Sequence, residues 1–161
     1  MATYKEMIIS IANQEFAGPS LNGPALIETL RSLAPEEAAS TDTYEGYSAW
    51  GVALHVLYFK HLVASELGAE VPPYNYEPVG FPKQPAETSR AAWDTLIGEL
   101  ELTHAGLIAA VEGASEERLN EIHESWKMPV WNSLMWAISH DTNHTAQIRS
   151  MGLPSLRKPV S

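Results

Sequence analysis

The sequence predicts an all-α fold, a four-helix bundle with a long Pro-rich crossover between the second and third principal helices. Apolar residues recur with helical spacing along most of the 161-residue chain, and no segment alternates in the manner of a strand. Glycines and prolines divide this pattern into four long stretches. With 45% apolar and 19% charged residues, the chain suits one domain over residues 1–161 with a substantial core.

The first helix is expected over residues 4–16, because Gly18 and Pro19 then interrupt the helical pattern. Apolar residues with helical spacing resume at Leu26 and continue as far as Pro35. The sequence therefore leaves two possibilities for this region, which are one kinked helix or two separate helices.

The second principal helix is expected to begin after Ser48, whose hydroxyl can cap the first turn, and to end at Gly68. Residues 71–85 contain five prolines, which exclude a helix, and three aromatic residues. The aromatic residues favour an ordered crossover that lies against the helices over a flexible domain linker. Such a crossover allows the two helices that it joins to run parallel.

The third principal helix is expected over residues 87–112, and Gly113 ends it. A short helical turn is expected within residues 115–126. The last helix is expected over residues 130–150, with Pro129 in its first turn, where the N–H that proline lacks would have no partner.

Composition argues against several classes of function. Twenty acidic against ten basic side chains give a formal charge of −10, which repels the phosphate backbone of nucleic acids. No stretch approaches the ~18 apolar residues of a membrane span and no export signal is visible, so a cytoplasmic protein without membrane contacts is expected. The chain has no cysteine, so imidazole or carboxylate groups must hold any soft metal.

The most informative pattern is a pair of histidines in the last helix, His140 and His144. Residues four apart stack on one face of a helix, so the two imidazoles can converge on one metal ion. The alternative is that the pair lines a polar groove without binding a metal. A zinc-protease motif is disfavoured, because Asp141 stands where that motif has the longer glutamate.

A third ligand would strengthen the metal hypothesis, and four histidines are candidates: His55, His61, His104 and His123. His55 and His61 are six residues apart on one helix, so they cannot face the same site. Helix geometry favours His55 only slightly. It leaves the other three open as hydrogen-bonded core, interface or loop histidines.

Several short patterns, taken in their order and spacing, resemble the DinB-like superfamily of metal-binding four-helix bundles. They are Trp50-x4-His55, Trp131-x2-Leu134-x5-His140-x3-His144-x2-Gln147-Ile148, and the segment from Gly18 to Pro24 followed by Leu30 and residues 35–38. The resemblance covers nearly the whole chain. It implies that His55, His140 and His144 hold one divalent metal ion.

The resemblance also implies an enzyme, because the superfamily includes members described as metal-dependent hydrolases and others that are thiol S-transferases. We therefore expect a small-molecule substrate and either hydrolysis or transfer of a low-molecular-weight thiol, which must be a cosubstrate since the chain has no cysteine. Three imidazoles leave a metal ion at least one open position. They suit Zn or Ni and do not distinguish between them.

Polar residues lie within one helical turn of the expected ligands in the last helix; they are Asp141, Asn143 and Gln147. Each can orient an imidazole. We single out Asp141 as a candidate for that role or for acid–base catalysis. The tryptophans are expected mainly in the core, although Trp50, Trp131 and Trp136 can alternatively shape a substrate pocket.

A homodimer is a further expectation, because the first helix carries more apolar side chains than one small core is expected to bury. These side chains are Met7, Ile8, Ile11 and Phe16. The alternative to an enzyme is a non-catalytic metal-binding or stress-related bundle whose main output is dimerisation or ligand sequestration, because metal ligands alone do not identify a reaction.

Overall fold

The computed structural model describes residues 2–78, 80 and 84–157. Its elements are α1 (Tyr4–Ala17), α2 (Leu26–Arg31), α3 (Pro35–Ala38), α4 (Ala49–Glu66), α5 (Arg90–Gly113), α6 (Glu116–Asn120), α7 (Val130–Arg149) and the short 3-10 helix η1 (Pro154–Leu156). Within these residues there is no strand, which confirms the all-α prediction. None of the helices so described combines the length and the apolar character needed to cross a membrane.

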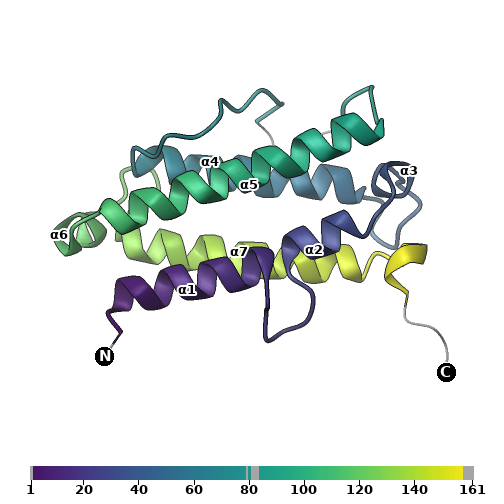
Figure 1. The fold of residues 1–161 in the computed structure, drawn as a ribbon. Helices are drawn as coiled ribbons and strands as arrows, with labels where there is room; N and C mark the ends of the chain where they lie inside the picture. Colours follow the sequence, from purple (N-terminus) through teal and green to yellow (C-terminus); the bar gives the residue numbers. More distant parts are fainter. Residues whose placement is uncertain (1, 79, 81–83, 158–161) are drawn as a thin grey trace.

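The four long helices α1, α4, α5 and α7 lie side by side (Figure 1). α4 packs against both α5 and α7, and α1 packs against α5 and α7. α4 and α5 both begin at the end of the molecule where α3 lies, and they run parallel to each other. α1 and α7 run in the opposite direction, toward that end (Figure 1). Because α4 and α7 are antiparallel neighbours, the N-terminal half of α4 lies beside the C-terminal half of α7.

α1 and α2 are two separate helices, which decides between the two possibilities that the sequence leaves. Gly18 ends α1 with a φ of 91°, a backbone conformation that favours glycine. Thr3 and Glu6 close the other end of α1 with a capping box, in which each side chain accepts the other residue's backbone N–H.

The starts of the later long helices are set by local hydrogen bonds. Ser48 and Ser89 each accept the backbone N–H three positions further on, at 3.0 and 3.2 Å, and so cap α4 and α5. The cap at Ser89 places the start of α5 at Arg90, three residues later than the expected residue 87. Pro129 has extended backbone angles and is the N-cap of α7, so the expectation of Pro129 inside the first turn is wrong.

Part of the segment between α4 and α5 lies against the helices. Tyr74 and Tyr76 pack against buried apolar residues of the core. On α5, Gly106 makes room for the segment, because a Cβ at this position would lie 2.4 Å from the carbonyl oxygen of Glu70. Positions 79 and 81–83 of the expected crossover lie outside the described residues.

The core consists of two apolar clusters that follow one another along the long helices. The first contains Trp50 and Trp93, whose ring centres lie 4.8 Å apart. The second contains Leu119 and Val130, at the end of the molecule where α6 lies. Buried polar side chains occur in the long helices between residues of the two clusters, among them Lys60, His104 and Asp141.

The apolar side chains of α1 divide between the core and the surface. Ile8 and Phe16 are 8% and 3% exposed, so they belong to the core of the single chain. These two side chains therefore do not contribute to a surplus over one core, because α1 packs this face against α5 and α7. Met7 and Ile11, which are 51% and 40% exposed, remain at the surface.

Candidate metal centre

Three imidazoles from two helices meet in the structure. His55 comes from the N-terminal half of α4, and His140 and His144 come from the C-terminal half of α7. The Nε2 atom of His140 lies 3.0 Å from that of His55 and 3.1 Å from that of His144. One nitrogen from each ring lies within 4.8 Å of the other two, so the three residues can hold a single metal ion.

The nitrogen separations suit ligands of one ion. Imidazole nitrogens bound at 2.0 to 2.1 Å, with angles between those of an octahedron and a tetrahedron, lie about 2.9 to 3.4 Å apart. The separations of 3.0 and 3.1 Å fall within this range. Two of the three nitrogen separations therefore match the spacing that coordination requires.

A chain of hydrogen bonds sets the orientation of His144. The side-chain N–H of Gln147 donates to Glu45 at 2.6 Å, which turns the amide oxygen of Gln147 toward Nδ1 of His144 at 2.7 Å. Because that oxygen can only accept, Nδ1 of His144 carries the proton. Nε2 is then left with its lone pair, which is the form that a metal ligand needs.

His55 is oriented in the same way from the other side of the site. Its Nδ1 donates to the backbone carbonyl of Gly80, which belongs to the segment between α4 and α5. Its Nε2 is therefore also the nitrogen with the lone pair, and it points at Nε2 of His140. Nε2 of His140 makes both short contacts, but it can carry only one proton. At most one contact can therefore be a hydrogen bond, and in the other two lone pairs face each other. A shared cation would relieve this repulsion.

Burial keeps the three rings neutral. It lowers the pKa of His140 to about 3, helped by the nearby His144, His55 and Lys60. Burial also lowers the pKa of His55 and of His144, in each case against a hydrogen bond that acts in the opposite direction. Near neutral pH, the lone pairs are therefore available to a metal without prior loss of a proton.

Aromatic side chains cover one side of the site. Trp136 stacks on His140, with ring centres 4.4 Å apart and planes inclined by 28°. Phe59 contacts both His55 and His140, with ring centres 4.8 and 5.3 Å apart. Of the tryptophans expected to shape a pocket, Trp136 thus borders the site, whereas Trp50 is buried in the core.

His144 also lines a wide, open groove at the surface. The groove is bordered by Glu45, Asn143, His144, Ala146, Gln147 and Ser150. This groove gives a small molecule a route from the surface to one of the three imidazoles.

The remaining histidines lie elsewhere. His61 contacts Ser65 one turn further along α4, at 3.3 Å. His104 is buried with its ring stacked on Phe16, the ring centres being 3.9 Å apart. His123 is buried in the connection between α6 and α7 and is 3% exposed. His104 is thus a hydrogen-bonded core histidine and His123 a buried loop histidine, whereas His61 is half-buried on α4.

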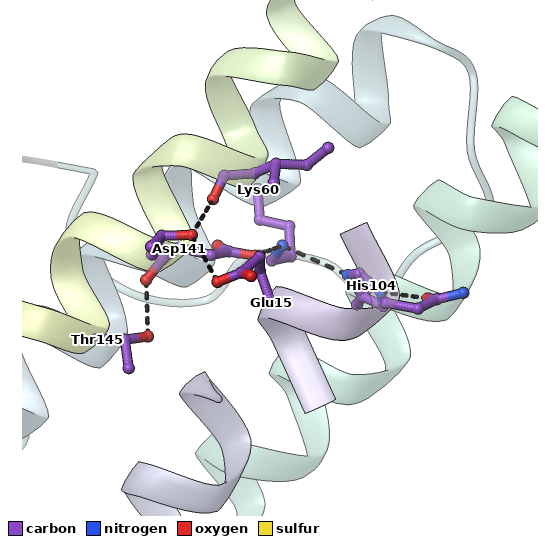
Figure 2. Close-up of polar contacts among 8 residues, drawn as sticks. Glu15, Lys60, His104, Asp141 and Thr145 are labelled. Carbon is purple, nitrogen blue, oxygen red and sulfur yellow. Dashed lines mark hydrogen bonds and ion pairs between the residues drawn. The ribbon is translucent and has the colours of Figure 1, made fainter. Parts of the chain in front are cut away.

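Asp141 follows a ligand in the sequence but faces the core. Its side chain is 4% exposed, and its Oδ2 accepts a hydrogen bond from the ammonium of Lys60 at 2.6 Å (Figure 2). Burial raises the pKa of Asp141, although the neighbouring ammonium acts in the opposite direction. The structure thus brings His55, His140, His144 and Gln147 together, and it directs Asp141 toward Lys60.

Sequence reasoning does not identify four contributors to this region: Glu45, Phe59, Lys60 and Gly80. Glu45 and Gly80 lie in connections between helices, 102 residues and 25 residues from their partners in the chain. Phe59 and Lys60 lie one turn beyond His55 on α4, but their roles depend on contacts with α5 and α7. A lysine within an otherwise buried apolar helix is the one local signal that could have attracted notice.

Antiparallel helices that bring three imidazoles to one point define a helical protein with a histidine cluster that could hold a metal ion. Residues 23–148 match the family model of the DinB superfamily, and this segment contains all three histidines. The chain therefore belongs to the DinB superfamily. No curated protein and no solved structure matches the chain.

Proposed function

We propose that the chain is a metal-dependent enzyme with one divalent ion, Zn or Ni, held by His55, His140 and His144. The observation that carries the proposal is the convergence of three Nε2 atoms at 3.0 and 3.1 Å, with Nδ1 of two rings engaged by oxygen acceptors. We assign the fold as a single-domain four-helix bundle of α1, α4, α5 and α7, with residues 71–85 as the crossover.

A divalent ion bound by three neutral imidazoles keeps its full charge and an open position, so it supplies Lewis-acid chemistry toward water, a thiol or a carbonyl group. The residues of the chain perform the other tasks. Gln147 and the carbonyl of Gly80 hold two imidazoles in the ligating form. Trp136 and Phe59 exclude water from one side of the site. The groove beside His144 receives a small-molecule substrate.

Two reactions are proposed for this site. One is hydrolysis of a small ester or amide, and the other is transfer of a low-molecular-weight thiol to an electrophile. The thiol must come from a cosubstrate, because the chain has no cysteine. For Asp141, the contact with Lys60 and the exposure of only 4% favour an indirect role through the position of α7 over direct proton transfer to a substrate.

A homodimer is also proposed, as is a non-catalytic metal-binding role as the alternative to an enzyme. The exposed side chains of Met7 and Ile11 on α1 support self-association. Nucleic acids are not proposed as partners, because the charge of −10 opposes their binding.

The test of the enzyme proposal uses metal-loaded protein and mass spectrometry of products. One set of reactions contains small esters or amides, and the other contains low-molecular-weight thiols with electrophiles. Turnover is expected in one set and is expected to vanish in a His140→Ala, His144→Ala double variant that is free of metal. Turnover that persists in this variant would contradict both reactions. Metal binding without turnover in either set would support the non-catalytic alternative.

A further inference from the structure

A buried polar chain crosses the core beside the metal site (Figure 2). Nζ of Lys60 on α4 lies 2.6 Å from Oδ2 of Asp141 on α7 and 3.5 Å from Nδ1 of His104 on α5. Nε2 of His104 lies 2.9 Å from the side-chain oxygen of Asn13 on α1. The chain thus links the four long helices. The side chains of Asp141, Lys60 and His104 are all buried, because these residues are at most 7% exposed.

Every hydrogen bond of this chain pairs a donor with an acceptor. The ammonium of Lys60 donates to Asp141 and to Nδ1 of His104, so Nε2 of His104 carries the proton that it donates to Asn13. Nζ of Lys60 also lies 4.8 Å from the centre of the Phe16 ring. The ammonium therefore has neighbours from α1, α5 and α7, which leaves little freedom in the position of α4.

Apolar packing by itself gives the first part of α4 little rotational preference. Six consecutive residues, 49–54, are all buried, so the buried surface covers the full circumference of this part of the helix. A helix that is apolar all round has no preferred side for its core contacts. A shift by one residue corresponds to a rotation of about 100°. It would separate Lys60 from Asp141 and leave two buried charges without partners, which is strongly unfavourable.

The same rotation determines whether the metal site exists, because α4 contributes a single ligand. His140 and His144 lie on one helix, so their separation is set locally by the four-residue spacing. His55 reaches them only if α4 presents the correct side to α7. Lys60 and Asp141 connect these two helices close to the site, since Asp141 directly follows His140 in the sequence. The ammonium of Lys60 is also near enough to His140 to lower its pKa.

We propose that Lys60 and Asp141 are positioning residues of the metal site, whose buried ion pair sets the rotation of α4 against α7 and so brings His55 to the other two imidazoles. The proposal rests on the proposed metal site. Buried polar pairs are known to select one helix register over others, whereas their replacement by apolar residues is often neutral for stability. The two effects can therefore be separated.

The experiment compares the unmodified chain with Lys60→Met and with the double variant Lys60→Met, Asp141→Leu. A third protein, Arg31→Met, Glu101→Leu, is the matched control, because it removes an ion pair between α2 and α5 that is exposed. Each protein is titrated with Co²⁺ at one fixed pH. The dissociation constant and the visible spectrum, which reports coordination geometry, are measured together with the melting temperature.

The double variant is expected to fold with a melting temperature near that of the unmodified chain, to bind Co²⁺ at least ~10-fold more weakly and to show an altered spectrum. The control is expected to match the unmodified chain in its affinity for Co²⁺ and in its spectrum. A folded double variant with unchanged affinity and spectrum would overturn the proposal. Loss of folding in both Lys60 variants would also overturn it, because the pair would then serve the fold as a whole. Failure of the unmodified chain to bind Co²⁺ would instead contradict the proposed metal site itself.

Discussion

The Nε2 atoms of His55 and His140 lie 3.0 Å apart, although 85 residues separate the two histidines in the sequence. Nδ1 of His55 is held by a backbone carbonyl on the other side of the ring, so the close approach involves the lone pair of Nε2. The contact joins α4 to α7 at the point where a metal ion would join them. The metal content of the protein, its free energy of unfolding and the dependence of that free energy on pH can be measured.

Removal of one imidazole is expected to abolish metal binding. Elemental analysis of protein purified without a histidine tag should show about one divalent metal per chain, because the three nitrogens surround one point. His144→Ala should lose it, since two imidazoles make a much weaker site. His61→Ala is the matched control, because His61 lies on α4 outside the cluster and should retain the metal. Stoichiometric metal in His144→Ala would contradict the assignment.

Metal is expected to stabilise the fold, because the ligands come from two helices and are brought together only when the chain is folded. Free metal at 100 times its Kd should add about 2.7 kcal/mol to the free energy of unfolding, if the unfolded chain binds little. For a chain of this length, this corresponds to an increase in Tm of roughly 5 to 10 °C in a calorimetric scan. His55→Ala should show no such increase. An unchanged Tm of the unmodified chain in saturating Zn or Ni would argue against a site that joins α4 to α7.

The acceptor on Nδ1 of His144 is expected to tune metal affinity. Gln147→Ala removes the amide oxygen 2.7 Å from this nitrogen, so the dissociation constant should rise by about 10-fold to 100-fold. Asn143→Ala is a matched control, because it removes an exposed amide from the same helix. Quenching of the fluorescence of Trp136, which stacks on His140, provides the titration signal, with Trp136→Phe to identify its contribution. Equal affinities of the Gln147 and Asn143 variants would refute this role of Gln147.

Acid is expected to destabilise the metal-free protein partly through His104. Burial lowers the pKa of His104 to about 2, against about 6.5 for an exposed imidazole. The unfolded chain therefore takes up the proton first, and this contribution to stability is complete above about pH 6.5 and is lost as the pH falls toward 2. The loss approaches 1.4 kcal/mol per pH unit within this window.

Urea unfolding at several pH values, with a chelator present, would measure this effect. Comparison with His104→Gln isolates the imidazole, because glutamine does not titrate and the other histidines are common to both proteins. The unmodified chain should lose stability more steeply with falling pH than the variant. Parallel pH profiles would show that His104 takes up a proton equally readily in the folded and unfolded states.

Self-association is expected to depend on the exposed side of α1. Sedimentation at tens of micromolar should show a dimer, and Met7→Gln, Ile11→Gln should shift it toward the monomer because both side chains lie at the surface. Leu102→Gln, on α5, is the control for loss of an exposed apolar side chain. A monomeric unmodified chain would refute the proposed homodimer.

The sequence by itself determined the helical class, the approximate helix boundaries and the pairing of His140 with His144. These features depend on residues only a few positions apart: the apolar period, the hydroxyl of Ser48 at the start of α4 and the four-residue spacing of the two imidazoles. The start of α5 was predicted three residues too early, because the hydroxyl of Ser89 caps this helix. Local periodicity does not reveal which residue caps a helix.

The tertiary structure decided the rest, because it depends on contacts between segments far apart in the chain. Helix spacing left His61, His104 and His123 open beside His55, and only the resemblance to a family singled out His55. The structure alone showed that Glu45 and Gly80 orient the imidazoles, and that Asp141 faces Lys60 across 81 residues of sequence. A side chain's position along its helix limits the directions in which it can point. The packing of that helix against its neighbours determines which partner it meets.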